Sequence, residues 1–263
     1  MKRKSKAPQK PLKGRVAIIT GGIGDIGLAA ARALKQRGAK VALGDLATPA
    51  AATKRAPGFH YTRVDTTKAR SIQAWIRKVD TDLGTPDLIV ANAGIVDLTG
   101  AMDGSEASWR RTIDINLTGA FLFVQAACRN LIHKELPGRV VLVGSWAAHA
   151  PHPRLSAYSV AKAGLRMLGQ CLALELAPHG IAVNEIAPGF VDAGLTGRIY
   201  EENPSLRETA RAHVPNGQLI EASEVGSQIA YLCDPSNRHM VGCVHLMDGG
   251  LSLLRLPPRR NPD

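Results

Sequence analysis

The sequence predicts an α/β fold, with a single doubly wound parallel sheet of about seven strands and helices on both faces. Apolar runs of strand length alternate with helical patterns along the chain, which is typical of βαβ units. Glycines also stand where helices need a C-terminal stop, at Gly38, Gly84, Gly138 and Gly180. The length of 263 residues suits one large domain that needs no disulfide or metal for stability.

Each strand is expected from a short apolar run, and each helix from the amphipathic stretch between two runs. The first strand contains the run VAIIT and leads into the helical segment LAAARAL. The strands are expected at residues 15–20, 40–45, 59–65, 87–91, 139–145, 181–187 and 243–247, and the helices at 25–37, 68–83, 106–133, 157–177 and 221–233. Only the 13 residues 46–58 separate the second and third strands, so a full crossover helix is not expected there.

The net charge of +11, from 33 Lys and Arg against 22 Asp and Glu, lies mostly at the two ends of the chain. Residues 1–13 hold six basic and no acidic side chains, and residues 255–263 hold three basic and one acidic, which leaves +3 for residues 14–254. We therefore expect one folded domain at 14–254 between disordered tails at 1–13 and 255–263. Because the basic signal belongs to the tails, no nucleic-acid or membrane partner is expected.

The cysteines and the apolar runs indicate a location. The four cysteines are far apart and have no C-x-x-C spacing, which favours a reducing, cytoplasmic location and no metal site. The apolar run after the basic N-terminus is too short for a signal peptide, and no uninterrupted run reaches about 18 residues, so no transmembrane helix is expected.

A glycine-rich segment, TGGIGDIG at residues 20–27, follows the first expected strand. Glycines at a strand-to-helix turn let backbone N–H groups approach a pyrophosphate, and the helix N-terminus adds a partial positive charge. Asp45 ends the second strand, where a carboxylate accepts hydrogen bonds from the adenosine ribose and repels a 2′-phosphate. These features predict a dinucleotide site that favours NAD over NADP. Asp65, at the end of the third strand, has two interpretations, an adenine contact or a surface turn.

A second group of polar residues follows the fifth expected strand. Ser145 ends that strand, Tyr158 lies on the next helix, and Lys162 follows four residues later. Residues i and i+4 share a helical face, so the Lys162 ammonium is expected to lower the pKa of the Tyr158 phenol and make it a general acid/base. A surface helix pair would have the same spacing. The order of Ser145, Tyr158 and Lys162 after a glycine-rich loop makes the catalytic interpretation the stronger one.

Further motifs accompany these residues: ANAG at residues 91–94, Asn116 in DINLTGAF, and PGFVDAGLT from Pro188. With TGGIGDIG, Asp65, Ser145 and the Tyr158/Lys162 pair, they make the chain resemble the short-chain dehydrogenase/reductase family from about residue 12 to about residue 254. The resemblance implies a Rossmann fold and a homotetramer or homodimer. It also implies reversible hydride transfer between a nicotinamide cofactor and an alcohol or ketone.

The resemblance also implies roles for single residues. Tyr158 would exchange the proton with the substrate oxygen, and Ser145 would hydrogen-bond that oxygen. Lys162 would lower the pKa of Tyr158 and bind the nicotinamide ribose, while Asn116 would hold a water in the proton relay. A structural alternative for Asn116 is hydrogen bonding within a long helix. Cofactor contacts are expected at Gly21, Asp25, Ile26, Asp45, Asp65, Asn92, Ala93, Gly94, Tyr158, Lys162, Pro188, Gly189 and Val191.

The chain departs from the family pattern at two positions. Asp25 stands where the usual T-G-x-x-x-G-x-G has glycine; it can cap the helix, but its carboxylate is expected close to the pyrophosphate. Ala193 stands where the family often has a Thr that bonds the nicotinamide carboxamide, and Thr196 is a candidate substitute. Both departures bear on cofactor affinity more than on the reaction class.

The substrate site is expected around Ser145, His149, Arg154 and Arg198, the last of which lies in the family's variable lid, residues 189–216. These basic residues suggest a substrate with an anionic group, whereas the alternative is that they are solvated surface arginines. A polyol, sugar, or hydroxyacyl or oxoacyl substrate is favoured. Two other function classes compete with an oxidoreductase. One is a nucleotide-binding regulatory or interaction protein, motivated by Asp25 and Ala193. The other is a Rossmann-like methyltransferase, which would not need the Tyr158/Lys162 pair.

Overall fold

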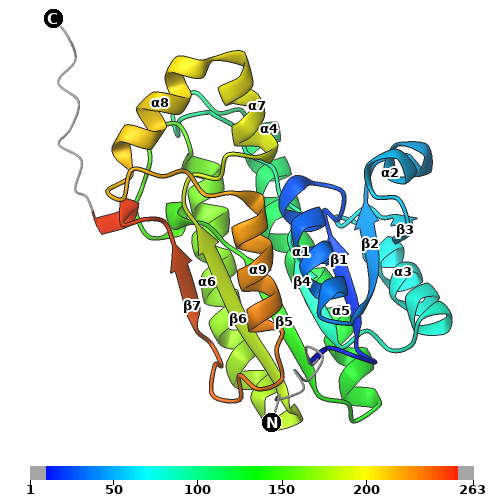
Figure 1. The fold of residues 1–263 in the computed structure, drawn as a ribbon. Coiled ribbons are helices and arrows are strands. Elements are labelled where there is room, and N and C mark those ends of the chain that lie inside the picture. The colour runs from blue at the N-terminus through cyan, green and yellow to red at the C-terminus, as the bar shows by residue number, and fades with distance from the viewer. Residues whose placement is uncertain (1–9, 254–263) are drawn as a thin grey trace, which may run out of the picture.

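The computed structural model describes residues 10–253, except for the side chains of Leu195, Thr196, Arg198 and Ile199. Within that range seven parallel strands form a sheet in the order β3-β2-β1-β4-β5-β6-β7 (Figure 1). The strands are β1 (Val16–Thr20), β2 (Lys40–Asp45), β3 (His60–Arg63), β4 (Leu88–Ala91), β5 (Gly138–Val143), β6 (Ile181–Pro188) and β7 (Val244–Met247). The doubly wound sheet predicted from the sequence is confirmed. Its strand order reverses between β1 and β4, which is where such folds open a crevice at the carboxyl ends of the strands.

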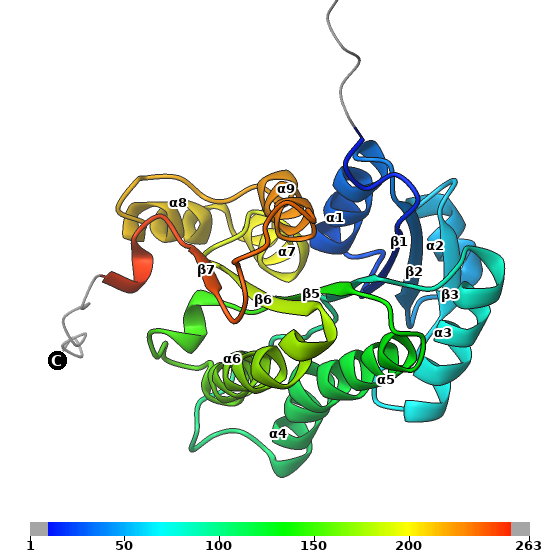
Figure 2. The same ribbon diagram turned by 90° about the horizontal axis from the view of Figure 1, so that it is seen from below.

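The described helices are α1 (Asp25–Gln36), α2 (Pro49–Arg55), α3 (Ala69–Asp82), α4 (Glu106–Ile113), α5 (Gly119–His133), α6 (Ser156–Leu176), α7 (Gly194–Glu202), α8 (Pro204–His213) and α9 (Ala222–Leu232). Figure 2 shows α1 and α9 on one side of the sheet and α3, α5 and α6 on the other. The central strands are therefore buried on both faces, which is why β1 and β4 read as the continuous apolar runs VAIIT and LIVA, whereas the edge strands β3 and β7 are partly exposed.

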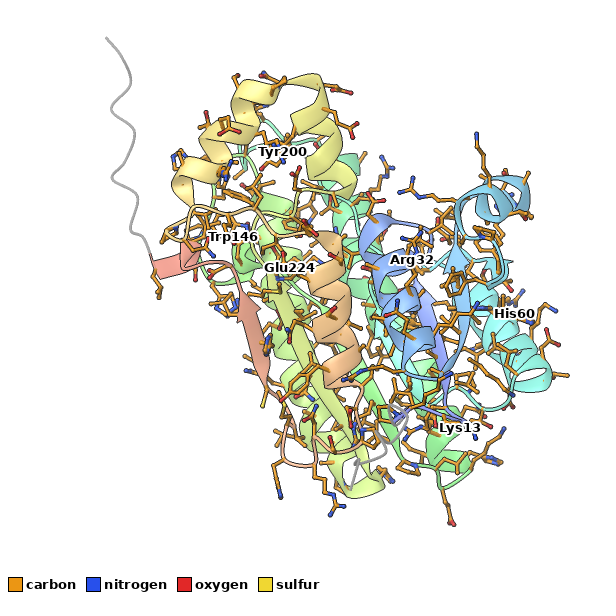
Figure 3. All side chains as sticks on the ribbon, in the orientation of Figure 1. Lys13, Arg32, His60, Trp146, Tyr200 and Glu224 are labelled. Atoms are coloured by element: carbon orange, nitrogen blue, oxygen red, sulfur yellow. The ribbon has the colours of Figure 1, made fainter. Side chains whose placement is uncertain are left out.

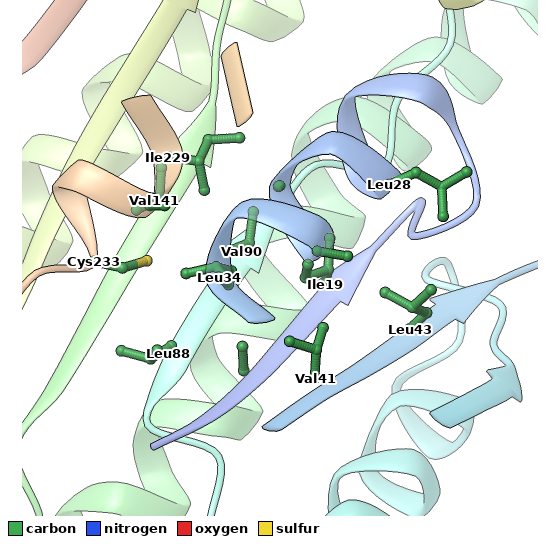
Figure 4. Packing of buried hydrophobic residues seen from close by; sticks show 14 of the residues in the cluster. Ile19, Leu28, Leu34, Val41, Leu43, Leu88, Val90, Val141, Ile229 and Cys233 are labelled. Carbon is green, nitrogen blue, oxygen red and sulfur yellow. The ribbon is translucent and has the colours of Figure 1, made fainter. Parts of the chain in front are cut away.

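Two apolar cores lie on the two faces of the sheet. On the first face, Leu34 and Ile229 bring α1 and α9 onto the sheet beside Val90 and Val141 (Figure 4). On the second face, Trp75 of α3 stacks on Phe123 of α5 with ring centroids 5.6 Å apart. The two cores hold the strand ends in place and so fix the crevice at the switch point.

The structure corrects several of the predicted boundaries. The helix expected at 106–133 is interrupted by a π-helical turn, Asp114–Thr118. Strand β5 ends at Val143, two residues before Ser145, which instead begins a 3-10 turn. The segment 46–58 holds a helix of two turns, α2, capped by the Thr48 side chain.

The start of the folded domain also differs from its predicted place. Leu12, which the sequence assigned to the basic tail, is fully buried in the first core, and its backbone N–H donates to the Arg37 carbonyl at 3.0 Å. The folded part therefore begins before residue 14. Residues 1–9 and 254–263 lie outside the described residues.

One helical stretch, Glu106–His133, is long and apolar enough to cross a membrane by length and composition. It comprises α4, the π-helical turn and α5, and its residues Phe123, Val124 and Leu131 are fully buried against the sheet. A single stretch of this kind is weak evidence for a membrane span, because a core helix of a globular protein passes the same test.

Candidate active site

A cleft opens at the carboxyl ends of the strands, on both sides of the point where the strand order reverses. Its lining brings together residues from seven separate segments of the chain. Of the residues proposed from the sequence, it contains Gly21, Asp25, Ile26, Asp45, Asn92, Ala93, Gly94, Asn116, Ser145, Tyr158, Lys162, Pro188, Gly189 and Val191. Asp65, His149 and Arg154 are not part of this lining.

The glycine-rich loop forms one wall of the cleft and is tied to β4. Gly21 has a φ of +62°, and a Cβ atom there would lie 2.9 Å from the Ala93 Cα, so only glycine fits. The Asn92 side-chain amide donates to the carbonyls of Thr20 and Gly21, both at 3.0 Å. In return, the Thr20 hydroxyl accepts from the backbone N–H groups of Asn92 and Ala93. These hydrogen bonds fix the position of the loop, and its glycines leave no bulky side chain in the way. Both features suit close approach by a dinucleotide.

The sequence suggests that Asp25 can cap α1, but Asp25 is the first residue of this helix, and its N-cap, Gly24, makes no side-chain hydrogen bond. The Asp25 Oδ2 accepts a hydrogen bond from the Gly194 backbone N–H at 2.6 Å, and its Oδ1 forms an ion pair with Arg55 of α2. The carboxylate therefore links three segments: the glycine-rich loop, α2 and the first residue of α7. Arg55 offsets the negative charge that Asp25 brings to the loop.

The two acidic residues at the ends of β2 and β3 have different surroundings. Asp45 lines the cleft, and its carboxylate accepts from the backbone N–H groups of Ile23 at 3.4 Å and Ala47 at 3.3 Å. Asp65 accepts from both the backbone N–H and the hydroxyl of Thr67. The turn interpretation of Asp65 describes its geometry, whereas Asp45 lies where the sequence placed it.

Ser145, Tyr158 and Lys162 meet on the opposite wall of the cleft. Lys162 is buried, donates to the Val143 carbonyl at 2.7 Å, and has its Nζ 5.6 Å from the centroid of the Tyr158 ring. The Ser145 Oγ accepts from the Ala147 backbone N–H at 3.2 Å, so its hydroxyl hydrogen is free to donate elsewhere. The i, i+4 spacing on α6 thus brings the ammonium to the tyrosine ring, as expected.

The ionisation of this group differs from the prediction. Burial raises the pKa of the Tyr158 phenol above its usual value, and the adjacent Ser145 hydroxyl offsets only part of the rise. Burial also lowers the pKa of Lys162 to about 8, against the opposing effect of the Glu185 carboxylate. The expected lowering of the Tyr158 pKa by Lys162 is not found, because desolvation dominates and raises it. The neutral phenol is suited to donate a proton.

Asn116 lies within the π-helical turn and is fully buried. Its amide nitrogen donates to the carbonyls of Ile95 and Thr112, and its Oδ1 accepts from the Ile95 backbone N–H at 3.0 Å. The side chain therefore fastens the loop after β4 to the turn. The extra residue of the π-helical turn presents this amide to the loop, and such turns often occur at functional sites.

Of the four residues expected to bind substrate, Ser145 lines the cleft, and the other three lie outside its lining or outside the described residues. His149 contacts the Arg166 guanidinium at 3.3 Å, and Arg154 is exposed in a left-handed conformation with a φ of +63°. The side chain of Arg198 lies outside the described residues. Thr196, the candidate substitute for the missing Thr at Ala193, lies outside them as well.

Sequence reasoning missed two features near the site. Trp146, directly after Ser145, is buried and makes edge-on contacts with Phe190 at 5.3 Å and His152 at 5.7 Å. In the view of Figure 3, Trp146 lies below Tyr200, which belongs to α7. The second feature is Glu185, a buried acid in the middle of the β6 run IAVNEIAP. A charged residue within a strand that is buried on both faces was the available signal.

Comparisons with known proteins agree with this geometry. The model of the enoyl-(acyl carrier protein) reductase family matches residues 22–252. Cis-4-hydroxycyclohexanecarboxylate dehydrogenase of Sinomonas cyclohexanicum is 36% identical over 242 residues, which covers 90% of this chain and 96% of the relative. The 3-oxoacyl-(acyl-carrier-protein) reductase of Vibrio cholerae is 30% identical and covers 92% of this chain and 99% of its own.

Two solved structures are also similar. The crystal structure of gox2181 superposes with a TM-score of 0.87 at 33% identity, covering 93% of this chain and 99% of the other. A putative 2-deoxy-D-gluconate 3-dehydrogenase from Agrobacterium tumefaciens, solved with bound NADP, has a TM-score of 0.84 at 26% identity and covers 94% of this chain and all of its own. The chain belongs to the short-chain dehydrogenase/reductase family of oxidoreductases, which act on CH–OH and keto groups with a nicotinamide cofactor.

Proposed function

We propose that this oxidoreductase interconverts a secondary alcohol and its ketone, uses NAD in preference to NADP, and exchanges the substrate proton through Tyr158. The observation that carries the proposal is the cleft itself, in which Tyr158, Ser145 and Lys162 face a glycine-rich loop across the carboxyl ends of β1, β4 and β5. A nicotinamide cofactor bound there supplies or accepts the hydride. The side chains of the cleft supply orientation and the proton.

Each side chain has a distinct task in this proposal. In ketone reduction the neutral Tyr158 phenol donates its proton to the carbonyl oxygen, for which its raised pKa is suitable. Ser145 donates a hydrogen bond to the same oxygen, because its own oxygen already accepts from Ala147. The Lys162 ammonium, near the ring, stabilises the phenolate left behind. Asn116 keeps the loop after β4 and the π-helical turn together. A water beside Asn116 would pass the proton on from the Tyr158 side of the cleft.

The fit of the cofactor is supported by the glycine cradle, which a Cβ atom at Gly21 would fill. The Asp45 carboxylate, held by Ile23 and Ala47 at the end of β2, favours NAD because it would repel a 2′-phosphate. Arg55 and Arg63, on neighbouring segments, could favour NADP by pairing with its 2′-phosphate. Both side chains already have partners: Arg55 pairs with Asp25, and Arg63 donates to the Leu46 carbonyl. Replacing Asp45 with Ala should raise the relative use of NADP. A wild-type preference for NADP would contradict this assignment.

We further propose a substrate with a ring or chain hydroxyl and an anionic group, of the hydroxy-acid, sugar-acid or oxoacyl type. The relatives act, by their names, on a hydroxycyclohexanecarboxylate, an oxoacyl carrier protein and a deoxygluconate, all of which carry a carbonyl or hydroxyl in the same molecule as an acidic or acyl group. Arg154 lies on the loop between Ser145 and Tyr158, and its exposed side chain is the one that we assign to pair with the anionic group.

A panel of hydroxycyclohexanecarboxylates, aldonates, polyols and oxoacyl thioesters, assayed with NAD and NADP by the absorbance of the reduced cofactor, tests the proposal. Tyr158→Phe should lose at least about 100-fold in kcat while it still binds the cofactor. Replacing Arg154 by Ala should raise KM for anionic substrates and leave KM for neutral ones unchanged. Full turnover in Tyr158→Phe would overturn the assignment of the proton donor.

We also propose a homo-oligomer, a tetramer or dimer, in a reducing cytoplasm. Val160, Met167 and Leu174 follow one another at intervals of seven on α6 and are 50%, 59% and 81% exposed. A stripe of this kind on a helix is typical of a surface that a second copy covers. The cysteines support the compartment, since Cys128 and Cys233 are buried free thiols whose pKa values burial raises to about 12.

A further inference from the structure

Glu185 is the one acidic side chain of β6, and it is buried inside the sheet directly behind the active-site cleft. It is 3% exposed, and neither of its carboxylate oxygens has a hydrogen-bond partner among the described residues. A buried carboxylate without a partner costs free energy, so chains keep one only where something compensates for it.

The backbone beside Glu185 is shaped around its carboxylate. Leu142 of β5 pairs with Glu185 in register, and the next inward-facing position on β5 is Gly144, whose N–H donates to the Ile186 carbonyl at 2.7 Å. A Cβ atom on Gly144 would overlap the Oε1 of Glu185. The absence of a side chain at Gly144 therefore provides the space that the carboxylate occupies, one residue before Ser145.

The same stretch of backbone also holds the catalytic lysine. The Lys162 ammonium donates to the carbonyl of Val143, the residue before Gly144. Lys162 and Glu185 thus lie against consecutive residues, Val143 at the end of β5 and Gly144 directly after it. Burial raises the pKa of Glu185 to about 7, and the cations of Arg166 and Lys162 offset part of that rise. The Glu185 carboxylate in turn offsets part of the lowering that burial causes in the pKa of Lys162.

One other cation faces the carboxylate. Arg166, one helical turn beyond Lys162 on α6, also lowers the pKa of Glu185. Its guanidinium contacts His149, and the negative charge of Asp248, directly after β7, raises the pKa of that histidine against the lowering by burial and Arg166. The neighbouring strands contribute only apolar groups or glycine at this level, Leu142 and Gly144 from β5 and Val244 from β7. Lys162 and Arg166 are therefore the charges that a carboxylate at Glu185 can compensate.

We propose that Glu185 is a positioning residue of the active site, whose buried carboxylate is the counter-charge that keeps Lys162 protonated beside Tyr158. Glu185 does not line the cleft, so it acts through Lys162 and not on the substrate. This inference rests on the proposed function of Tyr158 and Lys162. It explains how an ammonium bonded to a single carbonyl stays charged in a buried site.

The inference has a signature in the pH profile of ketone reduction. Deprotonation of Lys162, whose pKa is about 8, removes the charge that stabilises the Tyr158 phenolate, so kcat should fall on the basic side of the profile. Removing the carboxylate lowers the pKa of Lys162 further. In Glu185→Gln the basic limb of kcat should therefore move to lower pH by about one unit, which lowers kcat about fivefold at pH 8 and about tenfold at clearly higher pH. KM should change less than twofold, because Glu185 does not touch the substrate.

Two variants separate charge from packing. Glu185→Asp keeps the negative charge and should keep most of the wild-type profile. Glu175→Gln makes the same chemical change at an exposed position of α6 and should have no effect. If Glu185 served only to fill space, Glu185→Gln, which has nearly the same shape, would leave the pH profile unchanged.

A direct measurement on Lys162 tests the inference independently of turnover. In full-length protein made with 13Cε-labelled lysine, the Lys162 signal, identified by its loss in Lys162→Met, should titrate near pH 8 and show a second inflection near pH 7 from Glu185. Glu185→Gln should remove the second inflection and lower the titration midpoint. A wild-type Lys162 that titrates as an ordinary lysine without an inflection would overturn the inference, even if no Glu185 variant folds. Full activity in Tyr158→Phe would instead overturn the proposed function, and the Lys162 titration would still decide the role of Glu185.

Discussion

At the scale of single residues, Asp25 introduces a carboxylate into the glycine-rich loop and pairs with Arg55. We expect Asp25→Asn to tighten cofactor binding, because it removes a negative charge near the pyrophosphate. A like charge at a solvent-exposed site costs on the order of 1 kcal/mol, or roughly fivefold in Kd. Titration of the reduced cofactor by its fluorescence measures this change.

Arg55 provides the opposite test of the same pair. Arg55→Ala leaves the Asp25 charge without its partner and should weaken cofactor binding, whereas Lys54→Ala, one residue earlier on α2, should leave Kd within about twofold. Equal affinities in wild type, Asp25→Asn and Arg55→Ala would show that the pair has no electrostatic role in the cleft.

The residues that could be predicted from the sequence are those whose chemistry depends on local spacing. The i, i+4 relation brought Lys162 to Tyr158, and the glycines of the loop after β1 marked the cleft. Asp65 could not be resolved, because its hydroxyl partner Thr67 suits a turn as well as a site. The role of Glu185 could not be predicted, because it depends on the neighbouring Gly144 and Lys162, which come from other segments of the chain.

At the scale of elements, periodicity predicted the strands and the long helices but not their interruptions. The π-helical turn 114–118 lies inside an apolar stretch whose pattern does not change, so no local signal marks it. The two lid helices, α7 and α8, were not predicted, because α8 is polar with no buried residue and has little apolar period to read. The segment that the family resemblance assigns to the substrate lid is therefore the part least determined by the core.

The contact between α1 and α9 depends on a single glycine. A Cβ atom on Gly226 would lie 2.5 Å from the Ala29 carbonyl carbon and 2.8 Å from the Ala30 nitrogen, both backbone atoms of α1. We expect Gly226→Ala to separate the helices and lower the free energy of unfolding by about 1–3 kcal/mol, measured by urea denaturation. Ser227→Ala, at an exposed position next to it, should stay within about 0.5 kcal/mol of wild type. A Gly226→Ala protein as stable as wild type would show that the helices can move apart at little cost.

The ends of α3 and α5 are joined by an ion pair whose contribution depends on pH. The Lys134 ammonium, through its hydrogen bond at 2.6 Å, holds the pKa of Asp80 below its usual value of 3.8. A lowered carboxyl pKa contributes stability that is present above pH 3.8 and is lost as the pH falls through the folded-state value.

Lys134→Met should therefore destabilise the protein by about 0.2–1 kcal/mol at pH 7 and by progressively less below pH 4. Urea denaturation of both proteins at several pH values measures the difference. Lys78→Met removes the more exposed pair with Asp82 on α3 and serves as the control, with a smaller loss expected. A loss that stays constant down to pH 3 would assign the effect to packing of the Lys134 chain.

At the scale of the whole molecule, the fold class could be predicted because it follows from alternation along the chain, and the structure confirms it. The assembly of several copies could not be predicted in this way, because it depends on an exposed surface that contacts within one chain do not explain. The stripe of Val160, Met167 and Leu174 exposes apolar side chains along one side of α6, beside the long apolar stretch Glu106–His133. A second copy of the chain covering this face would remove it from water.

The stripe yields a test of assembly that is independent of catalysis. Leu174 is 81% exposed, so Leu174→Glu should leave the fold and its circular dichroism unchanged. If copies pair through α6, the added charges face each other across a dry interface, and the mass measured by light scattering should drop to that of the monomer or to half of the wild-type assembly. Leu206→Glu places the same charge on α8, 45% exposed and away from the stripe, and should keep the wild-type mass. An assembly that survives Leu174→Glu and Met167→Glu together would place the interface on another face of the molecule.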